Sequence, residues 1–343
     1  MAKSETSKTD RLKIAVLAGG ISSEREISLQ SGKCVAEALH QAGFEVVVSD
    51  IAPDNLKILD DASIDVFFVA LHGEFGEDGQ LQQILEDRCL CYTGSGPQAC
   101  RLSIDKVASK KAFEKAGVKV PQGIKFDGTR DIKIMENELA GLGQKFVVKP
   151  VTNGSSVGVS IIDDLGQTLE TAKNCLSQYG DCMIEQFIAG RELTVGVIAQ
   201  QALPILEIRP KTGFYDYYAK YIDDSTEYLF DTIDDQKLIE RISLDAVACF
   251  NALNNRHFAR VDFILDSQGQ AYALEINTIP GMTTHSCIPK ASAKIGISMP
   301  DLCAKIVRAA VSDYEKMKSL NSIKLQSSEK EKEKRQTLTR GIV

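Results

Sequence analysis

Short apolar runs alternate with a helical segment over the first third of the chain. The run Lys13–Ala18 ends at a glycine pair, and two further runs, Glu45–Asp50 and Asp65–Leu71, follow a helical pattern at about Glu26–Ala42. Strands that alternate with helices are typical of a parallel sheet. We therefore predict an N-terminal α/β domain over residues 1–102.

The remaining apolar runs are less regular and predict two α+β units. A helix is predicted over Asp105–Ala116, with Gly117 as its stop. The predicted strands are Lys145–Val148, Val159–Ile162, Met183–Phe187, Glu192–Ile198 and Leu203–Ile208. The first three of these strands fall in a central lobe, 103–190, and the last two in a C-terminal lobe, 191–318.

Two helices are predicted in the C-terminal lobe. One lies near Asp235–Leu253, because apolar residues recur on one face of it. These residues are Leu238, Ile242, Ala246 and Phe250. The other runs from about Pro300 to Lys316, and the charge-rich segment 319–343 predicts an exposed helix or a disordered tail.

A β-hairpin is the most informative element of the C-terminal lobe. The apolar runs Arg260–Leu265 and Ala271–Asn277 flank the polar turn Asp-Ser-Gln-Gly-Gln. If Asp266 pairs with Ala271, antiparallel register places Asp262 opposite Glu275. The same register places Arg260 opposite Asn277.

Side chains alternate between the two faces of a strand, so Arg260, Asp262, Glu275 and Asn277 are predicted to share one face. The other face is predicted to carry Val261, Phe263, Leu265, Leu274 and Ile276. Two opposed acids destabilise a hairpin unless a cation neutralises them. Carboxylate and amide oxygens suit Mg²⁺. The alternative is a solvated sheet face on which Arg260 neutralises the acids.

Composition and charge exclude several classes of protein. The chain has 343 residues, 43% hydrophobic and 25% charged, which is enough for two or three domains. A net charge of −7 argues against a nucleic-acid partner. Nine cysteines without a C-x-x-C pair favour reduced thiols over a zinc site. The polar N-terminus and the short run Val66–Leu71 predict a cytoplasmic protein with no membrane partner.

A predicted strand ending at Lys149 runs into the Gly/Ser loop Gly154–Gly158. Backbone N–H groups of such loops can cradle phosphate oxygens, and a lysine adds a charge. No G-K-[ST] follows, so the segment is not a Walker A motif, and an ordinary hairpin turn is the alternative. Lys106, at the start of a predicted helix, is either a second phosphate contact or a solvated lysine.

Two more polar loops follow strands of the α/β domain, where such sheets place their ligands. Glu24 lies in one of them, or else interacts only with a helix dipole; His72 lies in the other, or else is a turn residue. The segment Phe214–Tyr221 has four tyrosines and Lys220, which suits a lid that excludes water or a surface aromatic cluster. Together these features provide the phosphate contacts, the oxygen ligands for Mg²⁺ and the lid that phosphoryl transfer requires.

The ordered set of segments resembles the D-alanine–D-alanine ligase family of ATP-grasp enzymes. The matching segments are GGISSEREISLQSGK, ALHGEFGEDGQLQ, YTGSG, DK at 105–106, VVKP with GSSVGVS, FYDYYAKY, ARVDF and ALEINTIPGMTTHS. They follow the family's order from about residue 12 to 316. The resemblance implies a substrate-binding α/β domain before a two-lobed ATP-grasp fold, a homodimer, and a role in peptidoglycan precursor synthesis.

The resemblance also implies a two-step reaction with ATP as co-substrate. The carboxylate of one D-alanine attacks the γ-phosphate, which gives an acyl phosphate and ADP. The amino group of a second D-alanine then attacks that carbonyl, and the dipeptide and phosphate are released. Lys106 and Lys149 would contact phosphates, Ser156 would lie on the closing loop, Glu185 would read the adenine amino group, and Glu192 would hold ribose hydroxyls.

Other residues would bind metal and amino acid. Asp262, Glu275 and Asn277 would hold two Mg²⁺ or Mn²⁺ ions. Arg260 and the Gly281 N–H would form an oxyanion hole, and Ser286 would hold the second carboxylate. Glu24 would fix the first ammonium with His72 nearby; Tyr221, linked to Glu24 through Ser155, would complete the lid, and Lys220 would approach the γ-phosphate.

This chain departs from the family at several positions. Gln186 and Phe187 stand where lysine and tryptophan are frequent, Cys287 follows Ser286 where an aliphatic residue is usual, and the lid ends in TEYLFDTIDD. The alternatives are a ligase of the same fold that uses D-lactate or D-serine as acceptor, and a nucleotide-binding protein without turnover. A dehydrogenase would need a G-x-G-x-x-G fingerprint, which the sequence lacks.

Overall fold

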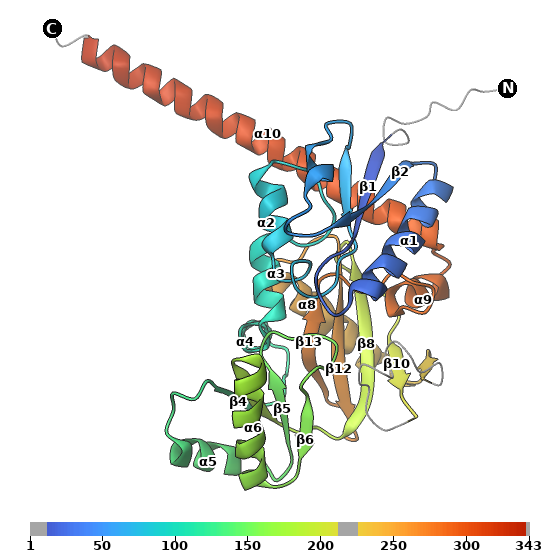
Figure 1. Cartoon of the computed structure of the whole chain (residues 1–343), viewed down its shortest axis with the longest axis vertical. Coiled ribbons are helices and arrows are strands. Elements are labelled where there is room, and N and C mark those ends of the chain that lie inside the picture. The colour runs from blue at the N-terminus through green and yellow to red at the C-terminus, as the bar shows by residue number, and fades with distance from the viewer. Residues whose placement is uncertain (1–11, 212–225, 341–343) are drawn as a thin grey trace.

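A parallel sheet forms the N-terminal part of the protein. The computed structural model describes residues 12–211 and 226–340, the last of these, from 321, by backbone only. Strands β1 (Lys13–Gly19), β2 (Glu45–Ile51) and β3 (Val66–Val69) pair in the order β2-β1-β3, all parallel. The predicted α/β sheet is therefore confirmed (Figure 1).

Helices surround this first sheet. They are α1 (Arg25–Gln41), α2 (Gln80–Asp87), α3 (Pro97–Ile104) and the short 3-10 helix η2 (Lys57–Asp60). β1 and β3 carry fully buried Val, Ile, Leu and Phe side chains on both faces, as expected of parallel strands covered on each side, whereas the edge strand β2 is largely exposed or half-buried. Glu24 and His72 follow β1 and β3, so the two loops meet at the carboxyl edge of the sheet.

A second sheet is antiparallel and belongs to the central part of the chain. Its strands are β4 (Gly123–Phe126), β7 (Cys182–Gln186), β5 (Phe146–Pro150) and β6 (Ser160–Ile162), in that order. Helices α5 (Ile132–Ala140) and α6 (Leu165–Tyr179) accompany it, at the bottom of Figure 1. β4, α5 and α6 carry no prediction from the sequence.

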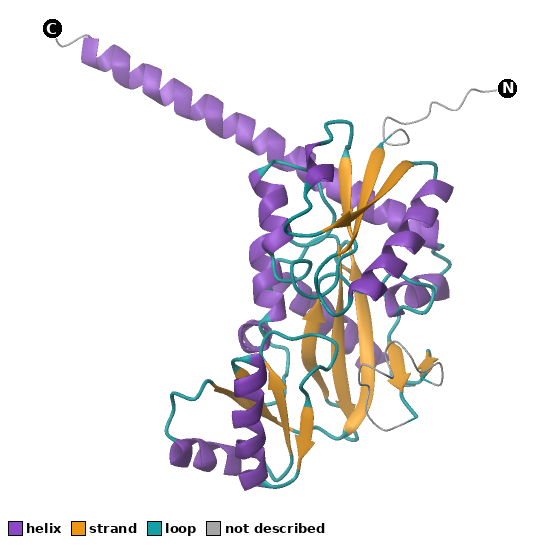
Figure 2. Cartoon of the chain, viewed as in Figure 1, coloured by secondary structure: helices purple, strands orange, loops and turns teal. Residues whose placement is uncertain are grey.

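The third sheet, also antiparallel, forms the centre of the molecule (Figure 2). Its path is β11 (Glu227–Leu229), β10 (Leu206–Arg209), β8 (Gly190–Ile198), β12 (Phe258–Asp266) and β13 (Ala271–Asn277), with β9 (Gln201–Ala202) paired to β8. Helix α8 (Gln236–Ala252) packs on it through its predicted apolar face, of which Ile242, Ala246 and Phe250 are fully buried. The mixed α/β and α+β fold class is confirmed.

The hairpin β12–β13 contains a bulge that changes one prediction. Residues 260–262 pair with 275–277 as predicted. Beyond them the register shifts, so that Ala271 pairs with Leu265 instead of with the next residue. The extra residue is Leu274, which lines a cavity. The prediction that Leu274 points to the core face was wrong, because a bulge re-aims the side chains beside it.

Three further helices complete the fold. α4 (Lys106–Lys115) begins at Asp105, whose carboxylate accepts hydrogen bonds from the N–H groups of Val107 and Ala108. α9 is Cys287–Lys294, and α10 is Met299–Arg340. The closing helix continues through most of the charge-rich segment, for which an exposed helix was one of the two predicted alternatives, and its C-terminal part projects away from the body (Figure 1). Within the described ranges, no helix is both long and apolar enough to span a bilayer.

Candidate active site

Two cavities meet where the three sheets approach one another. The first has a volume of about 520 Å³ and the second about 530 Å³, and Lys106, Asn153 and Glu275 line both. The first is also lined by the predicted residues Glu24, His72, Ser155, Arg260, Asn277, Gly281 and Ser286. The second is also lined by the predicted residues Lys149, Ser156, Glu185, Glu192 and Asp262. Lys220 and Tyr221 lie outside the described residues.

On the hairpin, Arg260 holds Asp262 through two hydrogen bonds. Its Nε and Nη2 donate to the two carboxylate oxygens at 2.9 and 2.8 Å, and Thr194 Oγ1 donates to Asp262 Oδ1 at 2.6 Å. A bidentate pair of this kind is among the strongest side-chain contacts. In this geometry Arg260 neutralises Asp262, as the alternative interpretation of the hairpin had it.

Glu275 and Asn277 stand on the same hairpin face with different partners. Glu275 Oε2 lies 3.5 Å from Lys106 Nζ, and its side chain is 28% exposed. Lys106 Nζ also donates to Asn153 O at 2.5 Å. Asn277 Oδ1 accepts from the Ile279 N–H at 2.9 Å. Glu275 and Asp262 are thus each paired with a cationic side chain, Lys106 and Arg260 respectively.

This oxygen set fits a hard divalent cation. Two carboxylates and an amide oxygen converge from paired strands, and Mg²⁺ uses such ligands together with substrate phosphates and water. A cation would replace the compensation that Arg260 and Lys106 supply. In the described ranges no group of three or more His, Cys, Asp or Glu residues is placed to hold a metal, so a site here depends on Asn277 or on the substrate.

A buried ion cluster forms the floor of the second cavity. Glu185 is 2% exposed and pairs with Lys149 at 2.5 Å and with Lys110, a residue that carried no prediction. Burial alone would raise the pKa of the Glu185 carboxyl, but Lys110 and Lys149 outweigh it and hold the pKa below its usual range. Burial lowers the pKa of Lys110 to about 8. The sequence feature that could have identified Lys110 is its position four residues after Lys106, which places both lysines on one face of the helix.

A second cluster lies at the far side of the second cavity. Glu207 is 3% exposed and is held by Arg191 and, at 2.8 Å, by Arg209. Burial opposes the charge, yet the hydrogen bonds from Arg191 and Arg209 lower the pKa of Glu207 to about 2. These three residues also carried no prediction.

The remaining walls of the second cavity are apolar. Val147, Ile161, Phe187, Ile264 and Leu274 line it. Lys145 Nζ lies 4.6 Å from the centre of the Phe187 ring. A slot with apolar sides and a few polar groups suits a planar heterocycle such as a purine. Neighbouring Gln186 accepts from the Gln122 N–H at 3.2 Å, so its side-chain oxygen is engaged within the lobe.

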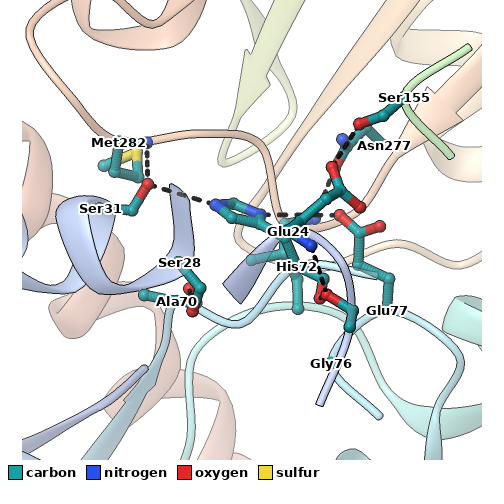
Figure 3. A network of polar contacts seen from close by, with 12 residues as sticks. Glu24, Ser28, Ser31, Ala70, His72, Gly76, Glu77, Ser155, Asn277 and Met282 are labelled. Atoms are coloured by element: carbon teal, nitrogen blue, oxygen red, sulfur yellow. Dashed lines mark hydrogen bonds and ion pairs between the residues drawn. The ribbon is translucent and has the colours of Figure 1, made fainter. Parts of the chain in front are cut away.

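The loop between β5 and β6 reaches across to the first sheet. Ser155 donates a short hydrogen bond to Glu24 Oε1, and Figure 3 shows the two side chains meeting. Ser155 and Ser156 have φ of 51° and 59°, in the left-handed region. Such conformations persist only where the surroundings enforce them. The loop therefore places adjacent hydroxyls toward the two different cavities.

His72 belongs to a polar chain in the first cavity (Figure 3). Its Nε2 lies 3.2 Å from Ser31 Oγ, which accepts from the Met282 N–H at 3.3 Å. Its Nδ1 lies 3.9 Å from Glu77 Oε1. Burial raises the pKa of Glu77, and His72 opposes that shift. Glu77 carried no prediction, although it lies in the loop that singled out His72.

The loop after β13 brings Gly281 and Ser286 together. A Cβ at position 281 would lie 2.7 Å from Ser286 Oγ, so only glycine fits there without a shift. Ser286 Oγ accepts from the Thr283 N–H at 3.1 Å and lies 2.9 Å from Thr283 Oγ1. Cys287, the first residue of α9, also lines the first cavity.

Known proteins share both the sequence and the fold. The family model described as the D-ala D-ala ligase C-terminus matches residues 113–308, more than half of the chain. A D-alanine–D-alanine ligase from Syntrophotalea carbinolica is 41% identical over 304 residues, which is 87% of this chain and 96% of the relative. One from Aquifex aeolicus is 39% identical over 298 residues, which is 86% of this chain and 100% of the relative.

Solved structures agree with these relatives. The Bacillus anthracis D-alanine–D-alanine ligase complexed with ATP has a TM-score of 0.77 and 29% identity, over 89% of this chain and 99% of that one. The VanG D-Ala:D-Ser ligase from Enterococcus faecalis has a TM-score of 0.77 and 27% identity, over 88% and 99%. The extent of identity along the whole matched length decides the assignment: the chain belongs to the D-alanine–D-alanine ligase family.

Proposed function

We propose that the protein joins two D-alanine molecules into D-alanyl-D-alanine with conversion of ATP to ADP and phosphate. The observation that carries the proposal is the meeting of two cavities at Lys106 and Glu275. One cavity suits a nucleotide, since apolar walls surround a cationic floor. The other suits small zwitterions, since carboxylates, hydroxyls and cations alternate on its walls. A phosphoryl group can pass between substrates only where such cavities join.

In the first step, the first cavity orients the donor. Glu24, with its hydroxyl partner Ser155, would bind the ammonium of the first D-alanine. The donor carboxylate would then attack the γ-phosphorus, the bond to the β-phosphate oxygen would break, and ADP would leave. Lys106 stands at the junction and would balance charge on the transferred group. Lys149, Ser156, Glu185 and Glu192 would hold the nucleotide in the second cavity.

In the second step, an amine replaces phosphate on the acyl carbon. Arg260 and the Gly281 N–H would stabilise the oxyanion, and Ser286 would hold the acceptor carboxylate. Arg260 is bound to Asp262 in the structure, so this role requires it to exchange or share that partner. Asp262, Glu275 and Asn277 would hold Mg²⁺ or Mn²⁺. When bound, such a cation would neutralise phosphate charge.

The same family resemblance supports a homodimer, and the use of ATP supports a cytoplasmic location. The family resemblance also supports the division of the chain into units that end at residues 102, 190 and 318. Sedimentation of the purified protein tests the dimer, and limited proteolysis tests the boundaries. A monomer at micromolar concentration would contradict the dimer.

Release of ADP and formation of dipeptide test the proposed function together. Purified protein with ATP, Mg²⁺ and D-alanine should produce both in equal amounts. D-serine and D-lactate, offered as acceptors beside D-alanine, test the neighbouring ligase specificities. Folded protein that binds ATP and forms no dipeptide with any acceptor would refute the proposal.

A further inference from the structure

The cations of the first cavity differ in how their charge is compensated. Among the described residues, three lysine and arginine side chains line it, and two of them, Lys106 and Arg260, are each paired with a carboxylate. The third is Lys290. Across the described part of the chain, no carboxylate forms an ion pair or hydrogen bond with its ammonium. Its one contact there is with the face of the Tyr228 ring, 5.2 Å from the ring centre.

This contact keeps the ammonium at the cavity wall. Tyr228 itself lines the first cavity, so a lysine held over its ring stays beside the cavity instead of extending into solvent. A cation–π contact leaves the donor capacity of the ammonium mostly unused. Lys290 therefore presents an uncompensated positive charge to whatever occupies the first cavity.

Helix geometry directs Lys290 toward Ser286. The N–H of Lys290 donates to Ser286 O at 3.2 Å in the first turn of α9. The Cα–Cβ bonds of a helix lean toward its N-terminus, and Ser286 is the N-cap residue of α9. The Lys290 side chain thus leans toward the residue proposed to hold the acceptor carboxylate. A serine hydroxyl supplies one donor and no charge, and a carboxylate taken from water needs a countercharge.

Resting on the proposed function, we propose that Lys290 binds the carboxylate of the acceptor D-alanine and selects acceptors that carry this negative charge. Lys290 is a specificity-determining residue in this assignment. Glu24 would read the ammonium of the donor at the other side of the cavity. Charges of opposite sign at the two ends would fix the orientation of each zwitterion and prevent it from binding in the reversed direction.

The test combines a side-chain change with a matched change in the acceptor. In Lys290→Met the KM for the acceptor D-alanine should rise roughly tenfold, because a charge-assisted contact in a half-open cavity is lost. The KM for the donor D-alanine should not change. With D-alaninamide, an acceptor of similar size without the carboxylate charge, wild type and variant should show the same KM. Lys290→Arg should restore most of the preference for D-alanine.

A neighbouring lysine provides the control. Lys294 lies on the same helix, pairs with Asp231 at 2.5 Å and does not line the first cavity. Lys294→Met should therefore leave both acceptors unaffected. Thermal unfolding of each variant verifies that the fold is retained, and Lys290→Gln replaces the methionine variant if that one unfolds.

The outcomes separate this inference from the proposed function. Equal loss with D-alanine and D-alaninamide would mean that Lys290 acts only on the structure, and would overturn the inference. An unchanged KM for D-alanine would overturn it as well, while dipeptide formation by the wild type would leave the proposed function standing. Absence of dipeptide with the wild type would overturn both.

Discussion

The two cavities treat charge in opposite ways. In the second cavity, acids and bases are nearly dry and compensate one another, as in the cluster of Lys110, Glu185 and Lys149. In the first cavity, Glu24 and His72 make hydrogen bonds to hydroxyls and loops, and the charges are only partly compensated. Breaking a dry pair leaves a buried charge alone, which destabilises the fold. Breaking a hydrogen bond beside an open cavity affects substrate binding far more than folding.

The largest effect is expected where both cavities meet. Glu275→Gln keeps the size of the side chain and removes the charge opposite Lys106. We expect kcat/KM for dipeptide formation to fall by about 10³-fold, because a charge placed at the transferred group is lost. ADP release and dipeptide formation measure it. As a control, Glu114→Gln, on the exposed side of α4, should behave as wild type. Full activity of Glu275→Gln would contradict the assignment of Glu275 as a metal ligand.

The buried cluster of the second cavity should respond in stability. Glu185→Gln leaves Lys110 and Lys149 together without an acid, and the free energy of unfolding should fall by about 3 kcal/mol. Urea unfolding measures this loss. Glu138→Gln breaks an exposed pair with Arg130 and should cost less than about 1 kcal/mol. Equal effects of the two substitutions would contradict the contrast between dry and solvated pairs.

The buried residue His257, which directly precedes β12, predicts a pH effect. His257 Nδ1 accepts from the Gly94 N–H at 3.0 Å and so ties β12 to the first sheet. Burial lowers the pKa of His257 to about 4, whereas in the unfolded chain the same imidazole has a pKa of about 6.5. The unfolded state therefore binds more protons between these values, and stability falls as pH drops through this window.

Between about pH 6.5 and pH 5 the loss should amount to roughly 1.5 kcal/mol. Urea unfolding at the two pH values measures it. His257→Asn does not titrate there and tolerates the φ of 62° at this position, so its pH dependence should be flatter. An identical slope in both proteins would exclude His257 as the cause.

The smallest effect is expected from one hydroxyl of the first cavity. Ser155→Gly removes the donor to Glu24, and glycine accepts the φ of 51° without strain. The KM for the donor D-alanine should rise roughly fivefold, with the free energy of unfolding unchanged. A loss of stability comparable to that of Glu185→Gln would remove the distinction between the cavities.

Local pattern predicted many of the elements, missed β4, α5 and α6, and failed where a single residue changes register. The alternation of apolar residues predicted the strands of the first sheet and the apolar face of α8. The facing of Leu274 was wrong, because a bulge inserts one residue and no composition signal marks it. Lys110, Glu77 and Glu207 were missed for another reason: charged residues are mostly exposed, and only the fold shows which ones are buried.

By itself, the sequence determined the alternation of strands and helix in the first sheet, the acids and the arginine on one hairpin face, and the ordered segments that match the family. These features depend on neighbours along the chain and on strand period. Tertiary structure decided which groups share a cavity, that Arg260 holds Asp262, and that Lys290 faces the first cavity with its charge uncompensated among the described residues. Electrostatic compensation depends on distance and burial in space, and neither can be read from separation along the chain.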